Sequence, residues 1–204
     1  MDIVAQPELN PQYDWLRSDA LEVAPLLLGW ELLTIIGGKE TAGRIVEVEA
    51  YHGAEDPASH AFRGPSPRNA PMYKGRGYIY TYRSYGIHTC MNIVTGSGGQ
   101  AQAVLIRALE PTVGLDTMAA RRQLTDPRLF AKGPGRLTQA LGITLGDSGQ
   151  QLGGRISLLP PQTPINQKDI IAGPRIGISA AKDNPWRFYL RQNRFVSGPR
   201  NMTR

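Results

Sequence analysis

Residues 44–60 read RIVEVEAYHGAEDPASH, and the first eight of them predict a β-strand around which the rest of the fold is arranged. Side chains alternate between the two faces of a strand, so the valines and the alanine of this segment share one apolar face, which is expected to pack in the core. Glu47, Glu49 and Tyr51 fall on the opposite face. Carboxylates and a phenol therefore stand side by side on a half-apolar strand, and His60 follows after a short loop.

The segments that flank this strand predict short elements separated by turns. Sixteen prolines and 23 glycines among 204 residues favour turns and short strands over a helix bundle. Ser18 is a candidate N-cap for a helix that ends at Gly29 and that Pro25 kinks or shortens. Further strands are expected over residues 30–36, 103–111, 175–179 and 187–191, and a hairpin of two strands over 77–94. A turn is expected over 37–43, and helices are expected over 113–124 and 136–143. Because no internal repeat or linker interrupts this pattern, the chain is interpreted as one α+β domain over residues 1–204.

Residues 52–77 lack a periodic apolar pattern. They are dense in glycine, proline, asparagine and arginine, which predicts an irregular loop. A loop of this length in a compact domain is usually functional or disordered, so this segment is a candidate part of a binding site.

The charge balance is basic, with 23 Lys and Arg against 17 Asp and Glu and a formal net charge of +6. Eighteen of the basic residues are arginine, which favours planar, bidentate contacts with phosphate groups. A basic balance is common among nucleic-acid-binding proteins and also among unrelated proteins, so it favours a nucleic-acid partner only modestly. The sequence contains no Gly-x-Ser-x-Gly elbow, P-loop or dinucleotide-binding fingerprint.

Cysteine content and hydropathy predict a soluble, cytoplasmic protein. The single cysteine, Cys90, excludes an internal disulfide and lies in an apolar run, where a buried, inert thiol is expected. The N-terminal residues lack a basic segment followed by an apolar core, so no secretory signal is expected. No apolar run approaches the length of a membrane span.

The acids and histidines near the central strand allow three interpretations. The groups concerned are Glu47, Glu49, His52, Glu55, Asp56 and His60. A metal site is the least favoured interpretation, because zinc sites usually combine His and Cys at short spacings and no cysteine lies nearby. A solvated strand face with salt bridges and a general base tuned by partial burial both remain open.

Six of the eight tyrosines lie between residues 51 and 85. Tyr78, Tyr80 and Tyr82 alternate along one strand, and core packing is the expected role of the first two. Tyr85 falls where the hairpin turns, so its ring is expected to project into solvent. Such a ring at a basic hairpin tip suits a wedge that enters a base stack, but single exposed aromatic residues also occur without a function.

Basic side chains interleave with these tyrosines, namely Arg63, Arg68, Lys74, Arg76 and Arg83. Cations beside stacking platforms suit a nucleobase and its phosphates, although a solvated surface is the common alternative for any single arginine. Arg107 differs because its neighbours are strongly apolar. A buried arginine requires a partner, and the acids near Glu49 are the candidates.

Five segments that occur together and in order carry a family resemblance. They are VEVEAYHGAEDPASH (46–60), PRNAPMY (67–73), YIYTYRSYGIHTCMN (78–92), VLIRALEP (104–111) and KGPGRLTQAL (132–141). With them, the chain resembles bacterial members of the alkyladenine (3-methyladenine) DNA glycosylase family from about Leu21 to Ser197. The resemblance implies an α+β domain with a mostly antiparallel, curved β core, flanking helices and a protruding β-hairpin.

The resemblance also implies roles for individual residues in base excision. Glu49 matches the general base of the family, and Arg107 matches the arginine that helps to hold the attacking water. Glu47 would share the Glu49 face by alternation, and a shared role for it stays open.

Other positions match the residues that hold the extruded base. Tyr51, His60 and Tyr82 match the aromatic walls between which the base stacks. Tyr85 matches the residue that fills the gap in the duplex, and Asn92 matches the residue that crowds the exocyclic amine of guanine.

The expected function is therefore monofunctional excision of damaged purines from double-stranded DNA, with no metal or organic cofactor, by a monomer that works on the nucleoid. Expected substrates are 3-methyladenine and other alkylated purines, with hypoxanthine and ethenoadenine as further candidates; the product is an abasic site. Arg83, Ser84 and His88 make the hairpin tip more polar than the family pattern. A non-catalytic nucleic-acid-binding module and a metal-dependent hydrolase are the rival interpretations.

Overall fold

The structure is a computed structural model that describes residues 11–198. The ends of the expected 1–204 domain, including the N-terminal segment in which no secretory signal is expected, lie outside the described residues. The α-helices are α1 (Ala20–Leu26), α2 (Leu115–Arg122) and α3 (Pro134–Leu141). The strands are β1 (Glu31–Ile36), β2 (Lys39–Tyr51), β3 (Ile79–Ser84), β4 (His88–Thr95), β5 (Gln102–Val113), β6 (Ile156–Leu159), β7 (Ile170–Gly173) and β8 (Arg187–Leu190). Short 3₁₀ helices are η1 (Pro11–Arg17), η2 (Gly53–Glu55), η3 (Ala70–Lys74), η4 (Pro127–Leu129), η5 (Leu145–Asp147) and η6 (Gln167–Asp169).

The strands form one sheet around β2, and this sheet confirms the expected α+β class. The strand order is β3-β4-β5-β2-β1-β6, while β8 pairs with β2 and with β7. Every strand pairing within residues 11–198 is antiparallel. Register shifts between Ile45 and Glu47 and between Glu47 and Val48 mark an irregularity in the β2–β5 pairing, which lies beside the acidic side chains of β2.

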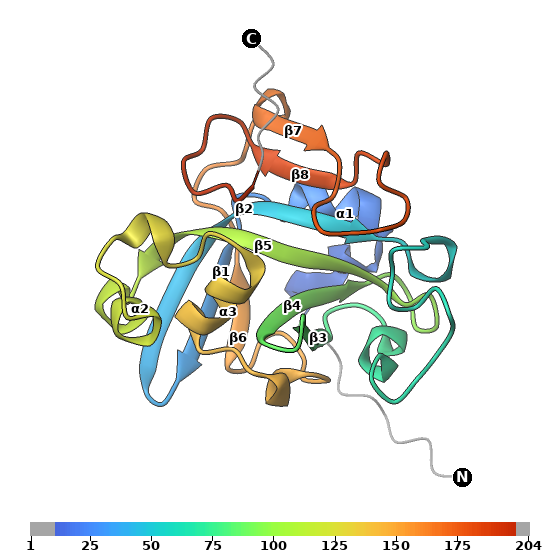
Figure 1. Ribbon diagram of the computed structural model, residues 1–204, viewed down its shortest axis with the longest axis horizontal. Helices are drawn as coiled ribbons and strands as arrows, with labels where there is room; N and C mark the ends of the chain where they lie inside the picture. The colour runs from blue at the N-terminus through green and yellow to red at the C-terminus, as the bar shows by residue number, and fades with distance from the viewer. Residues whose placement is uncertain (1–10, 199–204) are drawn as a thin grey trace.

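The helices cover the two sides of the sheet. In Figure 1, α2 and α3 lie in front of the sheet, and α1 lies behind it. The main core joins residues of all three helices to β1, β2, β4, β5, β6 and β8. A smaller cluster lies under the hairpin and includes Tyr78 and Tyr80, which are buried as the alternation predicts. None of the helices in the described part of the chain is long and apolar enough to cross a membrane.

Three local expectations are wrong, and each has a physical reason. The N-cap of α1 is Asp19 rather than Ser18, because the Asp19 carboxylate accepts a hydrogen bond from the Leu21 amide at 2.8 Å. The β1–β2 turn contains only Gly37 and Gly38, both with positive φ, so residues 39–43 extend β2. Residues 175–179 form bends rather than a strand, because Arg175 turns into the interior to pair with an acid.

The long loop over residues 52–77 is ordered into η2, η3 and tight turns. Asn69 ties it together, because its side-chain amide donates hydrogen bonds to the carbonyl groups of His60 at 2.9 Å and Gly64 at 3.0 Å. The Asn69 side-chain oxygen accepts from the Ser66 amide at 2.6 Å. These bonds fix the course of the chain on both sides of His60 and so place its ring against the hairpin.

Candidate active site

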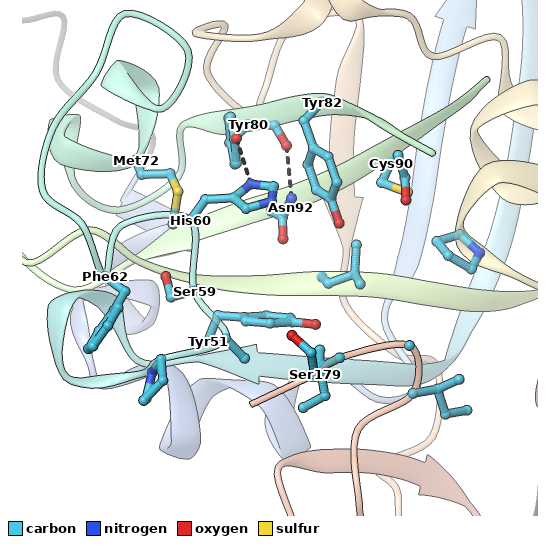
Figure 2. A pocket seen from close by; sticks show the side chains of 18 of the residues that line it. Tyr51, Ser59, His60, Phe62, Met72, Tyr80, Tyr82, Cys90, Asn92 and Ser179 are labelled. Carbon is cyan, nitrogen blue, oxygen red and sulfur yellow. Dashed lines mark hydrogen bonds between the residues drawn. The ribbon is translucent and has the colours of Figure 1, made fainter. Parts of the chain in front are cut away.

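A cavity of about 820 Å³ opens between β2, β5, the β3–β4 hairpin, the 52–77 loop and the bends after β7. Figure 2 shows the ring of Tyr51 facing the rings of His60 and Tyr82 across this cavity. These three residues, which the sequence places on separate segments, therefore line a single chamber.

Glu49 lies directly beneath the cavity and is fully buried. Its Oε1 accepts a hydrogen bond from the Ile176 amide at 2.7 Å and lies 3.1 Å from Nη1 of Arg107. Its Oε2 accepts from the Tyr51 hydroxyl at 3.0 Å. All three partners line the cavity, so the carboxylate is one contact away from anything bound there.

The polar face of β2 is buried rather than solvated, which overturns the salt-bridged surface interpretation. Glu47 is also fully buried, and its Oε1 lies 3.2 Å from Nε of Arg107 and 2.7 Å from Nε of Arg187. Its Oε2 accepts from the Ser197 amide at 2.6 Å. Two carboxylates and two guanidinium groups therefore form a closed, charge-balanced network below the cavity.

Arg107 connects the two acids and reaches the cavity. Its Nε lies against Glu47, whereas its Nη1 lies against Glu49. Burial disfavours the charged form, but the negative charges of Glu49 and Glu47 outweigh this effect and raise the pKa of Arg107. The guanidinium therefore supplies a permanent positive charge beside the Glu49 carboxylate.

The aromatic wall opposite Tyr51 is built from three rings in contact. The rings of His60 and Tyr82 meet edge to face with centroids 4.5 Å apart, and Tyr80 stacks on Tyr82 at 5.6 Å. Nδ1 of His60 lies 2.8 Å from the Tyr80 hydroxyl. Burial, with a further contribution from the positive charge of Arg68, lowers the pKa of His60 below its ordinary value of 6.5, so its ring is neutral at pH 7.

Asn92 and Cys90 line the same wall on β4. The side-chain amide of Asn92 donates a hydrogen bond to the Tyr80 carbonyl at 3.2 Å, as the dashed line in Figure 2 shows. This bond fixes the orientation of the Asn92 side chain.

Cys90 is buried as expected, and burial raises the pKa of its thiol. Burial also raises the pKa of Tyr51, and the adjacent Glu49 charge raises it further, so this phenol stays protonated as a donor.

Tyr85 occupies the tip of the hairpin between β3 and β4. Its side chain is 81% exposed, and its backbone has a φ of +49° in the left-handed region. The neighbouring Ile87 is 72% exposed. The tip therefore presents two apolar side chains to solvent at the mouth of the cavity, which Tyr85 helps to line.

The five cations near the loop occupy different places. Arg63 and Arg68 are exposed and line the cavity, and Arg83 is exposed on the hairpin. Lys74 lies over the ring of Tyr78, 5.0 Å from its centroid. Arg76 is paired with Asp14 in η1 at 2.8 Å. Arg63, Arg68 and Arg83 are therefore exposed cations, whereas Arg76 is paired with an acid.

The ion pair between Arg175 and Asp56 is absent from the sequence-based expectations, in which Asp56 is only one of several acids near the central strand. The Ile176 amide belongs to residues 175–179, which are expected from the sequence to line the pocket through backbone groups, with no side chain assigned. Arg175 lies in a segment that predicts a strand, and Asp56 stands before a proline as a turn acid does. The structure buries Arg175 and Asp56 completely and pairs them at 2.5 Å.

The acids and histidines of residues 47–60 are engaged in arginine pairs, turns and aromatic contacts. Across residues 11–198, no group of three or more His, Cys, Asp or Glu side chains is arranged to hold a metal ion.

The amino-acid sequence matches that of a known protein family. The sequence profile described as methylpurine-DNA glycosylase (MPG) matches residues 14–194. A protein of Rhodopseudomonas palustris is 53% identical over 178 residues, which cover 87% of this chain and 83% of that protein. A protein of Methanoculleus marisnigri is 50% identical over 182 residues (88% and 94%), and one of Nitrosospira multiformis is 48% identical over 191 residues (93% and 94%). All three carry the provisional name 3-methyladenine DNA glycosylase. The chain therefore belongs to the methylpurine-DNA glycosylase family and is a glycosyl hydrolase that acts on DNA.

Proposed function

We propose that this glycosylase extrudes damaged purines from double-stranded DNA into the aromatic cavity and hydrolyses their N-glycosidic bond with water activated by Glu49. Its substrates are 3-methyladenine and other alkylated purines, and they extend to hypoxanthine and ethenoadenine. The observation that carries this proposal is the buried contact of 3.1 Å between Glu49 and Arg107 directly beneath a chamber lined by Tyr51, His60 and Tyr82.

Binding begins with the phosphate backbone. Exposed arginines, namely Arg63 and Arg68 on the cavity and Arg83 on the β3–β4 hairpin, attract DNA without reading its sequence. Extrusion of one nucleotide costs a few kcal/mol of stacking and pairing, and a damaged or mispaired base costs least. Tyr85 offsets part of this cost by stacking in the vacated position.

The cavity selects the extruded base by stacking and by shape. An electron-poor alkylated ring stacks well between the electron-rich faces of Tyr51 on one side and Tyr82 with His60 on the other. Because Asn92 is fixed by its bond to the Tyr80 carbonyl, its side chain cannot move away from the exocyclic amine of a guanine. Guanine is therefore excluded more strongly than adenine derivatives.

The chemical step transfers a proton from water to Glu49. The water oxygen forms a bond to the anomeric carbon, the bond from that carbon to the purine nitrogen breaks, and the electron pair leaves with the base. In the structure, Oε1 of Glu49 accepts from the Ile176 amide and is paired with Arg107, whereas Oε2 accepts only from the Tyr51 hydroxyl, which leaves Oε2 a lone pair for the proton of the water. The negative charge of Glu49 also stabilises an oxocarbenium-like sugar. The product is an abasic site.

The chemistry is monofunctional, because a lyase step requires an amine nucleophile that forms a Schiff base. No lysine of the described residues lines the cavity. The nearest in sequence, Lys74, lies over the Tyr78 ring instead.

We further propose that residues 1–204 act as one domain and as a monomer on nucleoid DNA, since one chain supplies every group of the network beneath the cavity.

A panel of single-lesion duplexes under single turnover tests this function. We expect the enzyme to release free 3-methyladenine from methylated DNA. We also expect it to release hypoxanthine or ethenoadenine from synthetic duplexes that carry one such base, and to release no base from undamaged duplex. Activity is expected to survive excess chelator, and its loss would favour the metal-dependent hydrolase. Tight binding without base release on every lesion would favour the non-catalytic binding module.

A further inference from the structure

Arg175 and Asp56 form an ion pair that belongs to neither the Glu49–Arg107 network nor the cavity surface. Both side chains are completely buried, with Nη1 of Arg175 2.5 Å from Oδ2 of Asp56 and Nη2 2.9 Å from Oδ1. Nη1 also donates to the carbonyl of Ala50, the residue between Glu49 and Tyr51, at 3.0 Å. The guanidinium is thus fixed in a bidentate geometry against the end of β2.

The guanidinium of Arg175 supports the ring on which the extruded base is proposed to stack. Its Cζ lies 4.7 Å from the centroid of Tyr51 and 4.9 Å from that of Trp186. Tyr51 lines the cavity and Arg175 does not. The cation therefore packs against Tyr51 from the side away from the cavity and holds the plane of this wall.

The residue that follows Arg175 contacts the proposed general base. The Ile176 amide donates to Oε1 of Glu49 at 2.7 Å, and Ile176 and Gly177 line the cavity. A backbone amide is positioned by the residues on either side of it. Because Arg175 is locked by Asp56 and by the Ala50 carbonyl, the direction of the Ile176 N–H bond is set by this ion pair.

Asp56 also contacts the loop that carries His60 to the opposite wall of the cavity. Its Oδ1 accepts a hydrogen bond from the Ala58 amide at 3.0 Å, and its Oδ2 accepts from the His52 amide at 3.3 Å. These bonds shape the turn that leads directly into Ser59 and His60. One buried pair therefore contacts the Tyr51 wall and the loop that delivers His60, and it adjoins in sequence the amide beneath the cavity.

We propose that Arg175 is a positioning residue whose buried pair with Asp56 sets the Tyr51 ring, the Ile176 amide and, through that amide, the Glu49 carboxylate. This inference rests on the proposed function for its kinetic consequence. Its structural claim, that the ion pair holds the Ile176 amide on Glu49, stands separately. Stability alone does not require the pair, because apolar residues of similar size often replace a buried ion pair without loss of stability.

The test removes both charges at once. The variant Arg175→Met with Asp56→Leu keeps the interior apolar and leaves no unpaired charge. The matched control is Arg155→Met with Asp147→Leu, which removes a second ion pair with a buried carboxylate (2.8 Å) whose residues do not line the cavity. Both variants are compared with the wild type by circular dichroism, by single-turnover excision from methylated duplex and by hydrogen exchange of the Ile176 amide.

The expected result is a folded Arg175→Met, Asp56→Leu variant whose single-turnover rate falls by at least about tenfold, since small displacements of reacting groups are costly. Exchange of the Ile176 amide is expected to accelerate, while the control variant changes neither quantity. A fall of less than tenfold, or an equal fall in the control, would overturn the proposal.

Two further measurements separate this inference from the proposed function. If the double variant does not fold, Arg175→Lys decides, because lysine keeps the charge but not the bidentate fork. A loss of more than threefold in its rate supports the positioning role, and a smaller change overturns it. If the wild type releases no damaged base, the proposed function fails, and Ile176 exchange alone decides the structural claim. Exchange that is unchanged in the variant then overturns it.

Discussion

Nη1 of Arg107 lies 3.1 Å from Oε1 of Glu49, and both side chains are almost completely shielded from solvent. The two groups come from neighbouring strands, β2 and β5, which pair so that Glu49 lies opposite Leu105. Their contact therefore depends on the sheet register rather than on a mobile loop. A rigid charge pair therefore lies beneath the aromatic cavity.

Loss of the Glu47 charge is expected to destabilise the fold. Glu47→Gln removes the carboxylate that pairs with Arg187 and leaves Arg107 paired with Glu49 alone, and removing one member of a buried ion pair costs about 3–5 kcal/mol. The free energy of unfolding, measured by urea denaturation, should fall by about that amount. Glu22→Gln on the exposed side of α1 is the control and should change it by less than about 0.5 kcal/mol. A Glu47→Gln effect as small as the control would show that the network does not hold the fold together.

The stability of the protein is expected to fall as the pH falls below about 6.5 because of His60. Burial first, and the charge of Arg68 second, lower the pKa of His60 in the folded state, so the folded chain binds fewer protons than the unfolded chain between that lowered pKa and 6.5. This contribution to stability is complete above pH 6.5 and is lost as the pH falls to the lowered pKa.

An NMR titration of the imidazole protons measures this effect directly. Arg68→Ala should move the pKa of His60 upward, toward 6.5, whereas Arg63→Ala should leave it in place, although Arg63 also lines the cavity. Equal shifts in both variants, or none in either, would contradict the assigned cause.

Cations of the 52–77 loop and of the β3–β4 hairpin are expected to differ in their contribution to DNA binding. Arg83→Ala should weaken binding to any duplex and reduce the slope of log K against log salt by about one, as expected for one lost phosphate contact. Arg76→Ala should leave the slope unchanged, because Arg76 is paired with Asp14. Identical slopes for both variants would argue against the placement of DNA along the hairpin.

Tyr85 is expected to act in extrusion rather than in bond cleavage. Tyr85→Ser should reduce the extrusion equilibrium by about tenfold or more, in line with the roughly 1–3 kcal/mol that an aromatic stack contributes. Fluorescence of a reporter base beside the lesion measures extrusion, and single-turnover rates at saturating enzyme measure cleavage. Leu26→Ser, at a comparably exposed apolar position on α1, is the control. Unchanged reporter fluorescence in Tyr85→Ser would remove the wedge role.

The central strand and its neighbours can be predicted from sequence because local patterns determine them. Alternation along β2 places Glu47 and Glu49 on one face, and the apolar context of Arg107 indicates a buried ion pair. The burial of that polar face could not be predicted. It depends on Arg187 and Ser197, which are 140 and 150 residues away from Glu47.

Long-range partners also explain what sequence reasoning missed around the cavity. Arg175 lies in a segment whose alternation resembles a strand, and Asp56 precedes a proline as many turn acids do. Their pairing spans 119 residues, so neither position carries a local signal of the other. The strands β6 and β7, of four residues each, are also absent from the sequence-based expectations.

The most direct test of the proposed mechanism is the single-turnover excision rate of Glu49→Gln on methylated duplex DNA and on a duplex with one ethenoadenine or hypoxanthine. Glutamine keeps the size of the side chain but cannot accept the proton of the attacking water, so the rate should fall by at least about 100-fold while binding to damaged duplex is retained. Glu40→Gln, at an exposed position of the same strand, should retain the wild-type rate. A Glu49→Gln variant that releases the damaged base as fast as the wild type would contradict the account.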